Sequence, residues 1–260
     1  MVIGVYDSGL GGLSVWRELI NLNVSLIYFG DTAHAPYGEK TASQLQEYFW
    51  EISDFFQSKG CKAIVIACNT ASAMVLPPEE NFPIPVFGII EAGVQSSLAV
   101  CKGRLGVLAT RGTVESGVYQ QAFKKARPEW QVFAQSAPRL ATLVERGEMT
   151  EPSTKQAVQE YLTPLLEQDI DTLLLGCTHY PFLRPLIEEF VGPNVQIVDP
   201  AATLAQYVSE WLHNQKGVIK DNSESSRQFW VSAHPERFRE LAQSLLKMEI
   251  PEVNIHHMSS

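Results

Sequence analysis

The chain has 260 residues, of which 45% are apolar and 19% are charged. This composition is typical of a globular protein with enough apolar side chains for a sizeable core. Length alone allows either one large domain or two smaller ones. The formal net charge of −9 argues against nucleic-acid binding and against binding to acidic membranes, because both require a basic face. A small anionic ligand is still compatible with this charge, since helix N-termini can bind it.

Neither a targeting signal nor a membrane span is expected. Met1 leads directly into the apolar run Val2–Tyr6, without the basic flank and long apolar core of a signal peptide. No apolar run approaches the ~18–20 residues that a transmembrane helix needs. We therefore predict a cytoplasmic protein that binds neither membranes nor nucleic acid.

The cysteines predict neither a disulfide framework nor a metal site. They are few and widely spaced, and a reducing compartment keeps such thiols free. No CxxC or HxxxH spacing occurs, so the usual arrangement of zinc ligands along a chain is missing. The four residues are Cys61, Cys68, Cys101 and Cys177.

Short apolar runs alternate with amphipathic stretches, which predicts an α/β protein with largely parallel sheets. Strands are expected at Val2–Tyr6, Ser25–Gly30, Ala63–Ala67, Val86–Ile90, around Gly106, from Leu173, at Val195–Val198 and around Phe229–Val231. Helices are expected at Leu13–Leu22, after capping boxes at Thr41–Gln44 and Ser153–Gln156, around Leu204–Trp211 and from Pro235. Pro164 should kink or shorten its helix. A helix stop is expected at Pro77–Pro78 and a polar loop at Gln215–Ser226.

Two loops after predicted strands have the composition of ligand-binding segments. Asp7–Gly12 contains three glycines, which let backbone amides approach an anion at the start of a helix. The alternative is that Asp7 or Ser8 simply caps the helix. Asp31–Gly38 gathers aromatic, His, Pro and Gly residues, and is either a binding loop or a rigid turn.

Two segments share one residue pattern. Ile64–Ser72 and Leu173–His179 each run from apolar residues through Ala or Gly to a cysteine and then to polar residues. The carboxyl end of a buried strand is where open α/β sheets bind ligands. The repeat indicates an internal duplication, and hence two similar α/β units.

Cys68 and Cys177 are therefore interpreted as reactive, whereas Cys61 and Cys101 are expected to be inert core residues. Polar neighbours and a helix N-terminus are expected to lower the pKa of both reactive thiols. With a planar carbanion between them, one thiolate can remove a proton from one face and the other thiol can protonate the opposite face. This chemistry predicts a racemase or epimerase. Hydroxyls and amides in Asp7–Ser8, Asn69–Thr70 and Thr178–His179 are suited to stabilising charge on a substrate carboxylate.

Four motifs in the same order resemble bacterial glutamate racemases over nearly the whole chain. They are Asp7–Gly12, Pro36–Gly38, Cys68–Ser72 and Gly176–Pro181. The resemblance implies two pseudo-symmetric α/β domains with the active site in the cleft between them. Residues 1–94 plus 205–260 would form the domain carrying Cys68, and residues 95–204 the domain carrying Cys177. It also implies cofactor-independent interconversion of L- and D-glutamate, which supplies D-glutamate for peptidoglycan.

The resemblance assigns roles to individual residues. Cys68 is implied as the base toward D-glutamate and Cys177 as the base toward L-glutamate, with Asp7 and His179 assisting the thiols and contacting substrate. Further substrate-binding positions are implied at Ser8, Tyr37, Gly38, Asn69, Thr70 and Thr178.

The interpretation of Glu145 changes once the resemblance is taken into account. Its pattern with Arg139 and Arg146 favours a solvated helix face, but the resemblance implies an acidic residue of the active site. Thr110 and Thr113 are also expected to line this site.

The resemblance implies no cofactor, no metal and a homodimer. An aspartate racemase or another amino-acid racemase of the same family remains an alternative, because one methylene group gives only about 1–3 kcal/mol of discrimination. A non-catalytic amino-acid-binding protein with the same fold is the alternative from another class.

Overall fold

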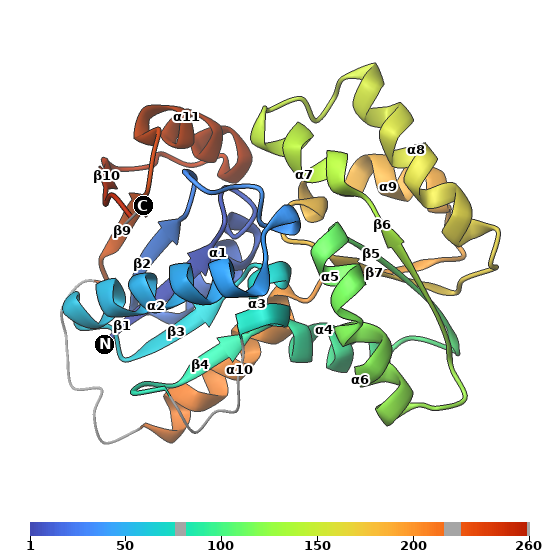
Figure 1. The fold of residues 1–260 in the computed structure, drawn as a ribbon, viewed down its shortest axis with the longest axis horizontal. Helices are drawn as coiled ribbons and strands as arrows, with labels where there is room; N and C mark the ends of the chain where they lie inside the picture. Colours follow the sequence, from blue (N-terminus) through green and yellow to red (C-terminus); the bar gives the residue numbers. More distant parts are fainter. Residues whose placement is uncertain (76–81, 216–224, 259–260) are drawn as a thin grey trace.

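Two parallel β-sheets organise the molecule, which a computed structural model describes at residues 1–75, 82–215 and 225–258 (Figure 1). The first sheet has the strand order β10-β9-β2-β1-β3-β4 and the second the order β6-β5-β7-β8. All neighbouring pairs run parallel. The first sheet comprises β1 (Val2–Asp7), β2 (Ser25–Gly30), β3 (Ala63–Ile66), β4 (Val86–Gly88), β9 (Arg227–Val231) and β10 (Val253–Ile255). The second comprises β5 (Arg104–Ala109), β6 (Gln131–Ser136), β7 (Thr172–Gly176) and β8 (Gln196–Val198).

Helices cover both faces of each sheet. The alternation of side chains along β1 places Val5 in one buried cluster and Tyr6 in another. The first cluster packs under α1 (Leu13–Leu19), α10 (Ala201–Asn214) and α11 (Pro235–Leu246), and the second under α2 (Ala42–Ser58) and α3 (Asn69–Val75). Around the second sheet lie α5 (Arg111–Ser116), α6 (Val118–Ala126), α7 (Pro138–Glu145), α8 (Pro152–Leu166) and α9 (Arg184–Val191). The predicted α/β class with largely parallel sheets is confirmed.

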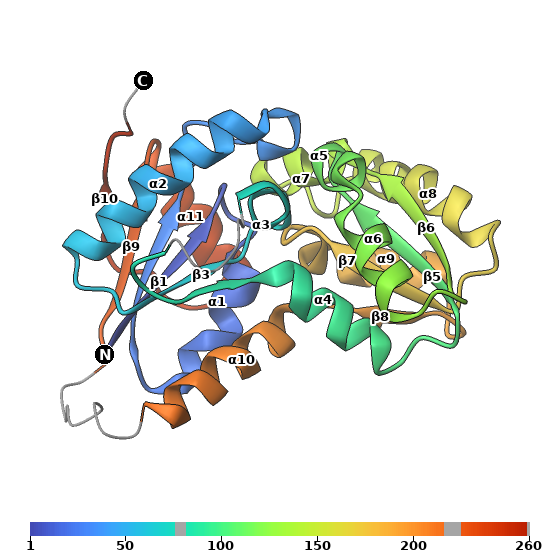
Figure 2. The ribbon, with the colours of Figure 1, turned by 60° about the horizontal axis from the view of Figure 1, so that its bottom comes forward.

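The chain passes from the first sheet to the second and later returns. Figure 2 shows α4 (Ile89–Leu98) running from the first sheet toward the second, with α10 beside it. Because α10 leads back to β9 and β10, the first sheet contains strands from both ends of the sequence. None of the helices in the described ranges is long and apolar enough to cross a membrane.

Most predicted elements are present, and several boundaries are wrong. The expected strand Val86–Ile90 ends at Gly88, and Ile89 already begins α4, because a short apolar run suits a buried helix start as well as a strand. The helix predicted at Leu13–Leu22 ends at Leu19 and continues as a 3₁₀ turn. The capping box at Thr41–Gln44 is confirmed. The predicted helix stop at Pro77–Pro78 and most of the predicted loop Gln215–Ser226 lie outside the described residues.

The second half of the chain holds further differences. The capping box predicted at Ser153–Gln156 is absent. Helix α8 already begins at Pro152, and the residue before it, Glu151, makes no side-chain cap. Pro164 lies near the end of α8, which stops at Leu166. The sequence does not predict the edge strands β6 and β10, since β6 contains several polar, partly exposed residues and β10 is only three residues long.

Gly4 in β1 provides a test of core packing. A Cβ at this position would lie 2.6 Å from the Phe56 ring, which is fully buried. Gly4→Ala should therefore destabilise the protein by about 1–3 kcal/mol through overpacking. In urea unfolding, Phe56→Leu should lower the free energy of unfolding less in the Gly4→Ala background than in the wild type. Strictly additive effects of the two changes would contradict this packing.

Candidate active site

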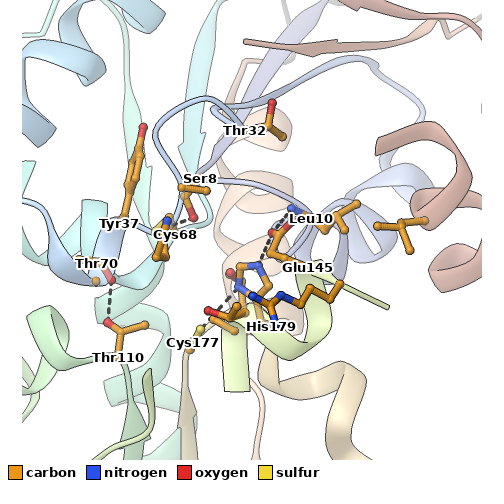
Figure 3. A pocket seen from close by; sticks show the side chains of 18 of the residues that line it. Ser8, Leu10, Thr32, Tyr37, Cys68, Thr70, Thr110, Glu145, Cys177 and His179 are labelled. Atoms are coloured by element: carbon orange, nitrogen blue, oxygen red, sulfur yellow. Dashed lines mark hydrogen bonds and ion pairs between the residues drawn. The ribbon is translucent and has the colours of Figure 1, made fainter. Parts of the chain in front are cut away.

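The carboxyl ends of strands from both sheets face one pocket with a volume of about 270 Å³. Cys68 follows β3 of the first sheet and Cys177 follows β7 of the second, and both line this pocket (Figure 3). The other predicted site residues on its wall are Ser8, Tyr37, Gly38, Asn69, Thr70, Thr110, Glu145, Thr178 and His179. The structure thus brings together residues that are widely separated in the sequence.

Cys68 is a buried thiol in a negatively charged environment. It is 5% exposed, and its Sγ lies 3.9 Å from Ser8 Oγ. Burial raises the pKa of the Cys68 thiol to about 12, and the charge of Asp7 adds to this increase. The expectation that its neighbours lower its pKa is therefore wrong, because desolvation outweighs the backbone N–H of Ala71. The raised pKa favours the protonated form of Cys68 at neutral pH.

Cys177 has a different partner. Its Sγ lies 3.6 Å from Nδ1 of His179, whose Nε2 donates to Glu145 Oε1 at 2.6 Å. Burial lowers the pKa of His179, but the hydrogen bonds to Cys177 and Glu145 raise it well above its usual value. The imidazolium form of His179 is thus favoured beside Cys177, where it is a suitable counter-ion for a thiolate.

Glu145 links this chain of contacts to the other sheet. Its Oε1 also accepts a hydrogen bond from the backbone N–H of Leu10 at 2.7 Å. Leu10 belongs to the glycine-rich loop between β1 and α1. The carboxylate that the sequence pattern places on a solvated helix face is therefore part of the pocket, where it connects His179 to this loop.

Asp7 lies behind the pocket wall. Its carboxylate accepts hydrogen bonds from Gly9 N–H and from Thr178 Oγ1, both at 3.0 Å. It is fully buried, and burial raises its pKa to about 6, even though the positive charge of His179 lowers it. The Thr178 bond therefore joins β1 of the first sheet to the segment after β7 that carries Cys177.

Two polar clusters support the other pocket residues. Asp31 accepts hydrogen bonds from Tyr37 OH at 2.6 Å and from Ser232 Oγ at 2.7 Å, which holds the loop that carries Tyr37. Thr70 Oγ1 lies 2.8 Å from Thr110 Oγ1 and 3.3 Å from Thr113 Oγ1. Thr70 and Thr110 line the pocket, whereas Thr113 supports them from behind.

Sequence reasoning missed the residues at one end of the pocket. Arg146, Arg237 and Leu241 line it, and the two arginines have exposed side chains. Arg237 also donates to the Glu145 carbonyl oxygen at 3.5 Å. The supporting role of Asp31 was detectable in the sequence, because Asp31 is an acidic residue at the carboxyl end of β2, the strand next to β1. Nothing in the sequence indicates that α11, the last helix, reaches this pocket.

The four cysteines are free thiols. In the described part of the chain, no group of three or more His, Cys, Asp and Glu side chains is arranged to hold a metal ion. The titratable side chains that line the pocket include the two thiols, His179, His234 and Glu145. One thiol from each sheet at a shared pocket defines a site suited to proton transfer at a carbon atom.

Comparison with known proteins agrees with this class of site. A model of the Asp/Glu/Hydantoin racemase family matches residues 18–208. The glutamate racemase of Desulforudis audaxviator is 43% identical over 258 residues, which cover 95% of this chain and 94% of the relative. Among solved structures, glutamate racemase isoform RacE1 from Bacillus anthracis has a TM-score of 0.91 and 35% identity, covering 99% of this chain and 97% of that one. Francisella tularensis glutamate racemase, solved in complex with D-glutamate, has a TM-score of 0.88 and 30% identity, with the same coverage of both chains.

The chain therefore belongs to the Asp/Glu/Hydantoin racemase family. Its similarity to glutamate racemases extends over nearly its whole length. The resemblance indicated by the four sequence motifs is confirmed.

The raised pKa of Asp7 predicts a pH-dependent effect of Asp7→Asn on stability. The folded protein binds the Asp7 proton more tightly than the unfolded chain does, so this proton stabilises the folded state. The stabilisation is complete below about pH 4. It is lost as the pH rises through about 6. Since Asn stays neutral, the free energy of unfolding of Asp7→Asn relative to the wild type should increase by about 1 kcal/mol between pH 5 and 8.

Urea unfolding at four pH values checks this prediction. Asp54→Asn, at an exposed position of α2, controls for the loss of a carboxylate elsewhere on the molecule. A stability difference for Asp7→Asn that stays constant with pH, or that falls as the pH rises, would contradict the raised pKa.

Proposed function

We propose that this chain interconverts L-glutamate and D-glutamate without a cofactor, using Cys68 and Cys177 as the two acid–base groups. The observation that carries the proposal is that two buried thiols, one from each sheet, line a single pocket. The names of the relatives, glutamate racemases at up to 43% identity, support glutamate as the substrate. The D-glutamate bound to the Francisella tularensis enzyme supports it further.

In the direction from L- to D-glutamate, Cys177 removes the α-proton. The imidazolium of His179, 3.6 Å from Cys177 Sγ, stabilises the required thiolate, and Glu145 in turn supports the imidazolium. Cys68, kept protonated by burial, donates a proton to the opposite face of the carbanion. The reverse direction exchanges the two roles. The α-ammonium group of the substrate then favours the Cys68 thiolate by introducing positive charge near it.

Negative charge develops on the α-carboxylate as the proton leaves, and hydrogen-bond donors around the pocket stabilise this charge. Ser8 and Thr70 supply hydroxyl groups on the pocket wall. Asn69 supplies an amide donor that binds a substrate carboxylate in the ground state and the transition state alike, and Thr178, whose hydroxyl donates to Asp7, forms another part of the wall. Tyr37 and Gly38 complete the binding surface, and His179 assists Cys177 and contacts substrate. Asp7, which the resemblance also implies as a substrate contact, lies behind the wall and assists the thiols from there. The exposed cations Arg146 and Arg237 attract a dicarboxylate to the pocket.

The proposal extends to cellular context and organisation. The resemblance to bacterial glutamate racemases supports a cytoplasmic homodimer that supplies D-glutamate for peptidoglycan. We propose two domains, residues 1–94 plus 205–260 and residues 95–204. The membership of β1–β4, β9 and β10 in one sheet and of β5–β8 in the other supports this division.

Each single cysteine change should stop racemisation. Serine is a far weaker base than a thiolate, so Cys68→Ser and Cys177→Ser should each lower kcat by about a hundredfold or more. Circular dichroism of glutamate, without added cofactor, measures the rate. Cys101→Ser is the matched control, because Cys101 is half-buried and lies outside the pocket. Normal racemisation by both active-site variants would refute the two-cysteine assignment.

The same assay separates the candidate substrates. We expect kcat/KM for glutamate to exceed that for aspartate by about tenfold or more, the size expected for one methylene group. A preference for aspartate would favour the alternative of an aspartate racemase. Binding of glutamate without any loss of optical activity would instead favour a non-catalytic amino-acid-binding protein.

A further inference from the structure

One buried donor in the candidate active site has no partner in the protein. Asn69, at the start of α3, is 2% exposed and lines the pocket. Its Oδ1 accepts a hydrogen bond from Tyr119 OH at 2.6 Å, whereas its Nδ2 is buried without a hydrogen-bond partner. Buried donors without partners are rare because leaving them unpaired is costly. The Asn69 NH₂ group is therefore available to a ligand of the pocket.

Tyr119 determines which end of this amide faces the ligand. Burial raises the pKa of Tyr119 far above its usual value, so its hydroxyl stays protonated. This hydroxyl donates to Asn69 Oδ1. The ring is 1% exposed and packs in the cluster under the second sheet. Gly93 on α4 leaves room for it, since a Cβ there would lie 2.8 Å from the Tyr119 hydroxyl. The hydroxyl is thus held in place, with the amide oxygen toward Tyr119 and the NH₂ group away from it.

We propose that Tyr119 is a positioning residue that turns the Asn69 NH₂ group toward a carboxylate oxygen of the substrate. This role rests on the proposed function, in which the substrate is a dicarboxylic amino acid. A carboxylate accepts hydrogen bonds and offers no donor, so it matches an NH₂ group and would be repelled by the amide oxygen. The bond runs from α6 beside the second sheet to α3 beside the first. The donor is consequently oriented only while these two helices remain in contact.

Tyr119→Phe tests the proposal, because it removes the hydroxyl and keeps the ring. Without this bond the amide can rotate, and the KM for L-glutamate should rise about tenfold, the size expected for one hydrogen bond. The value of kcat should change little, since the carboxylate is bound in the ground state and the transition state alike. Thr172→Val is the control. It removes a buried hydroxyl that bonds to Asp171 at the far end of β7, and should leave KM unchanged.

A double-mutant cycle separates positioning from a general loss of structure. Asn69→Ala should raise KM, and adding Tyr119→Phe to Asn69→Ala should raise it no further, because no amide is left to orient. The proposal is overturned if Tyr119→Phe leaves KM unchanged. It is also overturned if Tyr119→Phe raises KM equally in the presence and absence of the Asn69 amide. Thermal unfolding of each variant confirms that it is folded.

The outcomes also distinguish this proposal from the proposed function. If the wild type racemises glutamate and Asn69→Ala raises KM while Tyr119→Phe does not, only the positioning role fails. If the wild type does not racemise glutamate, the proposed function fails, and calorimetric Kd values for glutamate in the same four proteins replace KM. The absence of glutamate binding to the wild type would overturn both proposals.

Discussion

The close contact between the β1–α1 loop and the segment after β7 is the constraint on which the site depends. A Cβ at Gly11 would overlap His179 and Thr178, and a Cβ at Gly9 would overlap the Glu145 carboxylate. Glycine at these positions lets the backbone of the first sheet's loop lie directly against the side chains beyond the second sheet. This approach brings the segment that carries Cys177 close to the first sheet, so that thiols from both sheets line one small pocket. Figure 3 shows the result, with Cys68 and Cys177 among the same group of side chains.

The two thiols occupy equivalent positions in similar units but differ in electrostatic environment. Cys68 lies near the carboxylate of Asp7, and burial keeps it protonated. Cys177 lies beside His179, for which a positive charge is favoured. A symmetric reaction at carbon needs one acid and one base at any moment. In the proposed mechanism, this asymmetry prepares the site for one direction, with Cys177 as the base and Cys68 as the acid. Each turnover leaves the proton on the other thiol, which prepares the site for the opposite direction.

The sequence was sufficient to predict the fold class and the position of both thiols, because Cys68 and Cys177 directly follow apolar runs that form buried strands. It was insufficient for features that depend on distant contacts. Glu145 is a typical surface residue by pattern, and only the fold brings it to Leu10 and His179. Tyr119 has the pattern of any core aromatic residue. The pKa of Cys68 was predicted in the wrong direction, because burial is a property of the packed structure.

The pocket, the paired thiols and their surroundings lead to one central claim, that separate groups act on opposite faces of a single carbon atom. The most direct measurement follows the α-hydrogen during the first turnovers of L-glutamate in heavy water. If two thiols act, and both have exchanged their protons for deuterium, the D-glutamate formed carries deuterium at Cα while the remaining L-glutamate keeps its protium. D-glutamate that retains the original protium would mean that one group both removes and returns the proton, and would contradict the account.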